Sequence, residues 1–273
     1  MFCLPLKATI PRKPCDCRHL IQGSYKELAQ NAFFFTTHLE EISAKERSST
    51  FHDAIDFWSM SSTRSAQRPL GDRYTRHEVS VKIRVREKAP VVREWVVSTC
   101  HANIPSEHEI TAANLKLPPR SEMTVQIALD PLNRAHYGDS GSYLFSTLRL
   151  PKPNFLPFHL HARFAISSNR QSLIFSPGRN FVDPKTAFNA WILGDLVPSL
   201  YLTSLEYLKH RSSDENRERY DDGLWWLNSS QQPDDITIFV REAIFKFLPS
   251  SQSRLFQSAK WRMDKFPGSR ILP

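Results

Sequence analysis

Two histidines one residue apart, His159 and His161, are residues whose types and spacing could do chemistry. Two imidazoles at i and i+2 share one face of a strand, and they can bind zinc when a third ligand completes the site. No cysteine or carboxylate stands at an obvious complementary position in the sequence. We therefore expect surface or interface histidines here, on the wet face of a strand, and no metal.

A serine nucleophile is the second possibility. The run Gly138-Asp-Ser-Gly-Ser142 looks like the motif around the nucleophile of chymotrypsin-like serine proteases, in which a histidine takes the serine proton. His101 lies too near Ser140 for the two-barrel layout of those enzymes, and the chain turns helical where that fold needs more strands. We expect a turn that opens the strand at Tyr143, and we keep a serine hydrolase acting through Ser140 as an alternative.

The third candidate is a cation on a short loop. Residues 158–166 alternate between apolar and mostly polar side chains, which is the period of a strand with one dry and one wet face. Three turn residues follow, and the chain is apolar again up to Phe175. The pattern predicts a strand, a tight loop and a returning strand, with Asn169 and Arg170 in the loop. The plainest role for Arg170 is an ion pair with a nearby carboxylate such as Asp183.

The elements that must position these residues place strands before helices. The spacing predicts a helix over 24–33, strands over 79–85, 95–97, 123–129 and 143–150, and helices over 184–208 and 236–247. A polar loop is expected over 102–122. Pro198 should kink the long helix, and Trp191 should be buried against the strands. This order favours an α+β fold, with a mainly antiparallel or mixed sheet in the N-terminal two-thirds and packed helices after it.

Composition limits the class of protein. The chain has 273 residues, a formal net charge of +8 and four cysteines. The basic residues are spread and no nucleic-acid motif is present, so we expect no nucleic-acid partner. Cys15 and Cys17 are too close together for a zinc knuckle, which indicates free thiols. No signal peptide and no apolar run of membrane-spanning length is visible, so we expect a cytoplasmic or nuclear protein without a membrane partner.

The region 156–170 carries the strongest resemblance to a known family. Leu156-Pro-Phe-His and Phe164-Ala-Ile-Ser-Ser-Asn-Arg170 resemble the signature of sacsin-like proteins, which in that family follows a GHKL-type ATPase domain. Residues 2–6 resemble the strand that closes that ATPase domain, and residues 189–201 resemble a helix of the family. One departure is Gln171, where the family often has a second arginine.

The resemblance implies a chaperone-associated domain that works by protein–protein contact. The chain has no Asp-x-Gly-x-Gly loop for adenine, so we expect neither an enzyme nor a bound cofactor. In GHKL ATPases the neighbouring domain sends a basic side chain to the terminal phosphate. Arg170, with Asn169 beside it, is then the phosphate-sensing candidate toward a partner ATPase or chaperone. We also keep open a degenerate fragment without activity and a basic binding module for an acidic partner.

We divide the chain into four parts on this basis. Residues 1–42 would be the end of an ATPase domain with a connecting helix, and residues 43–76, rich in serine and arginine, a polar surface insertion. Residues 77–210 would form the sheet-and-helix domain that carries the signature, and residues 211–273 a C-terminal helical segment. We expect Arg170 at the exposed tip of its loop, on the side that faces residues 2–6.

Overall fold

The computed structural model describes residues 24–36, 38–46, 55–70, 72–117, 122–130, 142–176, 183–215 and 234–248. Strands dominate the first two-thirds of this part of the chain and helices follow, so the predicted α+β class is confirmed. None of the described helices is long and apolar enough to cross a membrane.

One mixed sheet contains all nine described strands. They are β1 Glu41–Glu46, β2 Ile55–Arg64, β3 Arg68–Pro69, β4 Tyr74–Val85, β5 Val91–Asn103, β6 Glu122–Leu129, β7 Ser142–Ser146, β8 Leu148–Asn154 and β9 His159–His161. In hydrogen-bonded order they run β1-β2-β4-β5-β6-β9-β7-β8, and β3 pairs with β4 beside this path. β9 is antiparallel to β6 and parallel to β7, so it is an interior strand. Pro151 and Pro153 lie in β8, which suits a strand at the edge.

Two helices begin at capping aspartates. α4 (Pro184–Trp191) follows Asp183, whose carboxylate accepts a hydrogen bond of 2.8 Å from the backbone N–H of Thr186. α6 (Asp235–Phe247) follows Asp234, which accepts bonds of 3.0 Å from two backbone N–H groups of the first turn. The other helical segments are α2 Ser24–Phe35, η1 Ser106–His108, α3 Glu109–Asn114, η2 Ile192–Leu196 and α5 Val197–Glu215.

A π-helical turn, η2, joins α4 to α5 directly before Pro198. Proline has no N–H, and its ring collides with the carbonyl four residues earlier, here that of Gly194, in a regular helix. The wider π turn accommodates this conflict, so the helix predicted over 184–208 continues through an irregular turn. A Cβ added at Gly194 would lie 3.3 Å from the ring of Phe239, so the glycine also lets α6 pack closely here.

Two compact units divide the chain. The first comprises Met1–Ser65 and Glu78–Trp95, and the second comprises Ala66–His77 and Val96–Pro273. β4 and β5 therefore contribute residues to both units. The candidate residues of the signature segment all belong to the second unit.

In the first unit, α2 lies on β2. The rings of Phe34 and Trp95 pack with their centroids 4.2 Å apart. The guanidinium of Arg64, at the end of β2, donates a hydrogen bond of 2.9 Å to the backbone carbonyl of Phe33. This bond satisfies a carbonyl in the last turn of α2, which has no partner within the helix.

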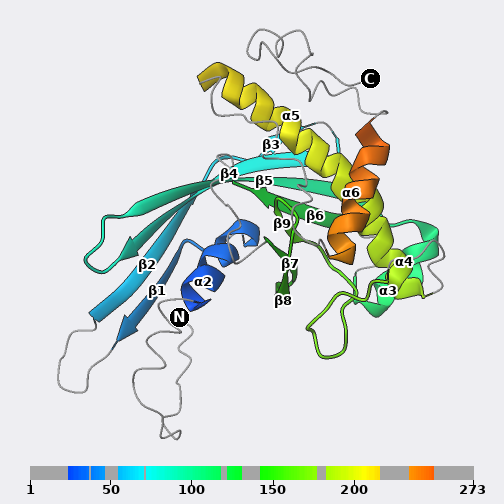
Figure 1. Ribbon diagram of the computed structural model, residues 1–273, viewed down its shortest axis with the longest axis horizontal. Helices are drawn as coiled ribbons and strands as arrows, with labels where there is room; N and C mark the ends of the chain where they lie inside the picture. The colour runs from blue at the N-terminus through cyan, green and yellow to red at the C-terminus, as the bar shows by residue number, and fades with distance from the viewer. Residues whose placement is uncertain are drawn as a thin grey trace, which may run out of the picture. The chain divides into compact units, whose positions relative to one another are not determined.

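In the second unit, the core lies between the strands and the helices α4, α5 and α6. α5 lies against β6, and α6 packs against η2 and α5 (Figure 1). The rings of Phe158 and Tyr201 meet with their centroids 4.8 Å apart, which joins the signature segment to α5. Both rings are buried. The predicted packing of this helix on the strand layer is therefore confirmed.

Three expectations about the elements are wrong. The stretch 43–76, predicted to be a polar surface insertion, instead forms most of β1, all of β2 and β3 and the start of β4. In β2, Trp58 and Met60 alternate with small polar residues and are buried. The polar loop over 102–122 contains η1 and α3, whose Ala112 joins the core. Trp191 is only partly buried, because it stands at the end of α4 beside a cavity.

Candidate functional site

The loop that carries Arg170 is closed by hydrogen bonds among its own residues. The backbone N–H of Ser167 donates to the carbonyl of Ser172 at 2.9 Å, and that of Arg170 donates to the carbonyl of Ser167 at 2.8 Å. The Oδ1 atom of Asn169 accepts from the hydroxyl of Ser167 at 2.6 Å and from the N–H of Gln171 at 3.2 Å. Asn169 thus fixes the shape of a tight turn.

Arg170 lies at the exposed part of this turn in the left-handed backbone region, with φ of 55°. A positive φ is uncommon for any residue other than glycine, asparagine or aspartate, and it costs about 1–2 kcal/mol. The hydrogen bonds of the loop hold the residue in this conformation. Glu87, Lys116 and Thr147 also adopt a positive φ in this structure.

The ion pair considered between Arg170 and Asp183 does not form. The carboxylate of Asp183 instead caps α4 and accepts from both the N–H and the hydroxyl of Thr186, at 2.8 and 2.9 Å. The bond from the N–H of Thr186 lowers the pKa of Asp183. Arg170 makes no ion pair with any residue that the structure describes. Residues 2–6, which Arg170 is expected to face, lie outside the described residues.

A buried amide anchors both arms of the loop to α4. Asn189 is fully buried, and its Oδ1 atom accepts a hydrogen bond of 2.9 Å from the N–H of Ala165. Its Nδ2 atom donates to the carbonyls of Ala165 and Ile174 at 2.7 and 2.8 Å. Because Ala165 precedes the loop and Ile174 follows it, one side chain fixes the loop to the helix. We did not identify Asn189 from the sequence; a polar residue between the buried Phe188 and Ala190 was the available signal.

The strand predicted over 158–166 is shorter than expected. Only His159–His161 pair as β9, and a single bridge between Ile166 and Leu173 closes the arms of the loop. The strand, loop and return are therefore present, but most of the two arms is irregular. The bonds of Asn189 replace the ladder that longer strands would supply.

The wet face predicted for this strand is also wrong. His159 is only 5 % exposed, because β9 has a neighbour on each side and the rings of Tyr143 and Phe145 lie against the imidazole. Its Nδ1 atom accepts a hydrogen bond of 3.1 Å from the N–H of Tyr143, which requires a neutral ring. Burial, with nearby arginines, lowers the pKa of His159 to about 3 and that of His161 to about 4. Within the described ranges, no cluster of side chains could hold a metal ion.

The other candidate nucleophiles give no catalytic arrangement in the described residues. Ser140 lies outside them, as do Cys15 and Cys17. The hydroxyl of Ser142 is buried and donates to the side-chain Oδ1 of Asn154. Cys100 is a buried free thiol, and burial raises its pKa to about 11, which keeps it protonated and poorly nucleophilic at neutral pH.

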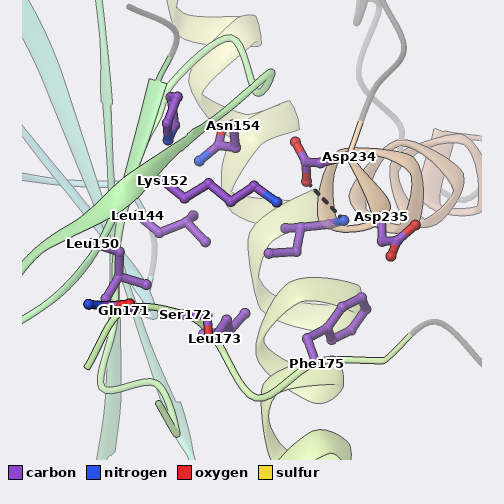
Figure 2. Close-up of a pocket in the computed structure, with 12 residues that line it drawn as sticks. Leu144, Leu150, Lys152, Asn154, Gln171, Ser172, Leu173, Phe175, Asp234 and Asp235 are labelled. Carbon is purple, nitrogen blue, oxygen red and sulfur yellow. Dashed lines mark hydrogen bonds between the residues drawn. The ribbon is translucent and has the colours of Figure 1, made fainter. Parts of the chain in front are cut away.

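A pocket of about 180 Å³ opens beside the Arg170 loop (Figure 2). Residues of β7, β8, the end of the loop and the start of α6 line it. Its polar side chains are those of Lys152, Asn154, Gln171, Ser172, Asp234 and Asp235. Figure 2 shows Lys152 pointing across the pocket toward Asp234.

Donor groups and carboxylates both line this pocket. Asn154 is buried and accepts through Oδ1 from the N–H of Leu156 at 2.9 Å, while its Nδ2 atom has no hydrogen-bond partner among the described residues. The ammonium of Lys152 adds a donor, whereas the hydroxyl of Ser172 already donates to the Oγ atom of Ser167 at 3.2 Å. The carboxylates of Asp234 and Asp235 outnumber this one ammonium, so the pocket itself does not favour an anion, and Arg170 on the adjacent loop is the candidate cation. No nucleophile and base stand together among the described residues that line this pocket.

Comparisons with known proteins add no relative, because no family model, no curated protein and no solved structure matches this chain. The resemblance to sacsin-like proteins rests on the quoted residues alone. What the chain does is therefore inferred from the geometry of the Arg170 loop and of the pocket beside it.

Proposed function

We propose that this chain is a non-catalytic, chaperone-associated domain of the sacsin-like type that binds a protein partner, a GHKL-type ATPase or a chaperone built on one. Arg170 reaches the terminal phosphate of a nucleotide held by that partner, and Asn169 shapes the loop that presents it. The observation that carries the proposal is the exposed guanidinium of Arg170 on a rigidly held loop. Hydrogen bonds among the residues of the loop close it, and the buried side chain of Asn189 anchors it to α4.

A phosphate-sensing arginine works best from a rigid support. A guanidinium is planar, always charged and able to form two parallel hydrogen bonds to phosphate oxygens. A loop that Asn169 and Asn189 already hold adds little ordering cost when Arg170 binds. A cation held in this way stabilises the charge that develops on a transferring phosphoryl group.

The charge of the chain as a whole suits an acidic partner surface. Its formal net charge is +8, and Arg170 is exposed on the loop. Complementary charge speeds encounter and fixes the orientation of two proteins. The proposal places the protein in the cytosol or nucleus, where ATP-dependent chaperones and their nucleotide are present.

Arg170→Ala tests this proposal. Adding the full-length chain to a separate sacsin-type ATPase domain should raise ATP turnover by at least about tenfold, because an arginine supplied in trans stabilises the transition state. Arg170→Ala should remove this stimulation, and Arg170→Lys should retain part of it as a point charge. Turnover is measured by phosphate release at saturating ATP.

Arg163→Ala is the matched control, because Arg163 is an exposed arginine in the same segment but outside the loop. It should stimulate turnover like the wild type. Turnover that does not respond to the wild-type chain, or stimulation that survives Arg170→Ala, would remove the phosphate-sensing role.

A further inference from the structure

A second cavity, of about 490 Å³, lies in the same unit and shares no lining residue with the pocket of Figure 2. Residues of η1, α4, η2 and α6 form its walls. Pockets for small ligands span about 300–1,000 Å³, so this volume suits a small molecule or a long side chain. Neither the resemblance nor the proposed function assigns a role to it.

A buried histidine lies in the wall of this cavity. His108 is 9 % exposed, and its ring lies against Phe188 and Trp191 with centroids 5.8 and 5.4 Å away. Within the described part of the chain, its ring nitrogens have no hydrogen-bond partner. Burial lowers the pKa of His108, although Glu107 and Asp195 act in the opposite direction. A neutral imidazole has one nitrogen that can accept a hydrogen bond from a ligand.

The π-helical turn places a carboxylate at the same cavity. Asp195 belongs to η2, and π turns within helices are frequent at functional sites. Asp195 is exposed, and partial desolvation of its carboxyl raises its pKa. Gly194 and Phe239, in contact at this turn, form the adjoining wall.

The charge of the cavity is opposite to that of the chain. Glu107, Asp195 and Glu242 line it, against a single cation, Lys246. None of the four forms an ion pair with another described residue. The cavity therefore presents an excess of negative charge beside an aromatic wall, in a protein whose formal net charge is +8. Aromatic faces and carboxylates both attract cations.

We infer that this cavity binds a primary alkylammonium group. The N–H groups of the ammonium donate hydrogen bonds to Asp195 and His108, and its methylenes lie along Trp191 and the small side chains of α4. A primary ammonium has the N–H groups that a neutral imidazole and a carboxylate accept, whereas a quaternary ammonium has none. The group is either a free amine or the side chain of a lysine on a protein. This inference is independent of the Arg170 proposal.

Calorimetric titration of the full-length chain with n-hexylamine tests the inference. Hexylamine should bind saturably and at least about tenfold more tightly than 1-hexanol, since charge-assisted hydrogen bonds are the stronger ones. Hexyltrimethylammonium should bind more weakly than hexylamine, because it cannot donate. Nα-acetyl-lysine methylamide separates the two sources: tighter binding than hexylamine indicates a protein lysine, and weaker binding indicates a free amine.

Two substitutions identify the charges involved. Asp195→Asn should weaken hexylamine binding about tenfold or more, and Lys246→Gln should strengthen it by removing a like charge. Glu109→Gln is the matched control: it removes one exposed carboxylate that does not line the cavity, and it should leave the Kd within twofold. The inference is overturned if hexylamine does not bind, or if it binds no more tightly than hexanol. It is also overturned if neither Asp195→Asn nor Lys246→Gln changes the Kd of hexylamine.

Discussion

Acidification from pH 7 to pH 4 should lower the free energy of unfolding by about 3 kcal/mol for each of two histidines of β9, the buried His159 and the partly buried His161. Folded His159 and His161 have pKa values of about 3 and about 4, against about 6.5 in an unfolded chain. Below pH 6.5 the unfolded chain therefore binds protons that the folded protein does not. The stabilisation is complete above about pH 6.5, and it is lost as the pH falls toward the folded values.

Urea unfolding at a series of pH values measures this effect. His159→Asn keeps an acceptor for the N–H of Tyr143 but does not titrate. It should therefore reduce the slope of the free energy of unfolding against pH by up to about 1.4 kcal/mol per pH unit. His38→Asn changes an exposed histidine and should follow the wild-type curve. A wild-type slope in His159→Asn would show that this ring is not held neutral in the folded protein.

Replacing Asn189 with alanine should destabilise the protein by about 3 kcal/mol, because it leaves buried backbone groups without partners. The N–H of Ala165 and the carbonyl of Ile174 have Asn189 as their side-chain partner, and Ala165 is only 1 % exposed. Water cannot easily replace the lost bonds at a buried site. The loop that carries Arg170 should loosen at the same time.

Asn169→Ala is the control, since it makes the same chemical change on the exposed part of the loop. It should cost less than about 1 kcal/mol in urea melts. Hydrogen exchange at the amide of Ala165 should accelerate strongly in Asn189→Ala and little in Asn169→Ala. Equal losses of stability in the two variants would mean that the bonds of Asn189 are not important to the fold.

The helices were largely predictable because their signals are local. Asp183 and Asp234 stand directly before periodic helical stretches, and each caps its helix. The missed α3 lies in a segment with prolines on both sides and few large apolar residues, which made its short helical period hard to see. The strand β2 was missed because Ser59, between Trp58 and Met60, and the serines that follow made a half-buried strand look like a polar insertion.

The burial of His159 could not be read from alternation alone. A strand with polar residues on one face is expected at the edge of a layer, with that face in water. Here β9 lies between β6 and β7, and the aromatic side chains of β7 come from another part of the chain to cover the imidazole. Which face is covered is a property of the tertiary fold.

The candidate site was predictable only in part. The turn residues before Arg170 predict an exposed loop, and the structure has that loop. The anchoring by Asn189 joins residues 24 positions apart, so no local pattern reveals it. The cavity around His108 and Asp195 likewise joins η1 to a π turn far along the sequence. For Asn189 the signal was a polar residue where a buried apolar one would be expected.

The most direct test of the central claim is whether the protein distinguishes a partner ATPase carrying ATP from one carrying ADP. A contact between Arg170 and the terminal phosphate should make wild-type chain bind the ATPase loaded with a non-hydrolysable ATP analogue about tenfold more tightly than the ADP form, since charge-assisted hydrogen bonds are worth about 1.5–3 kcal/mol. Arg170→Ala should bind both forms with equal affinity, while Arg163→Ala should keep the difference. Equal affinity of the wild-type chain for the two forms would contradict the account.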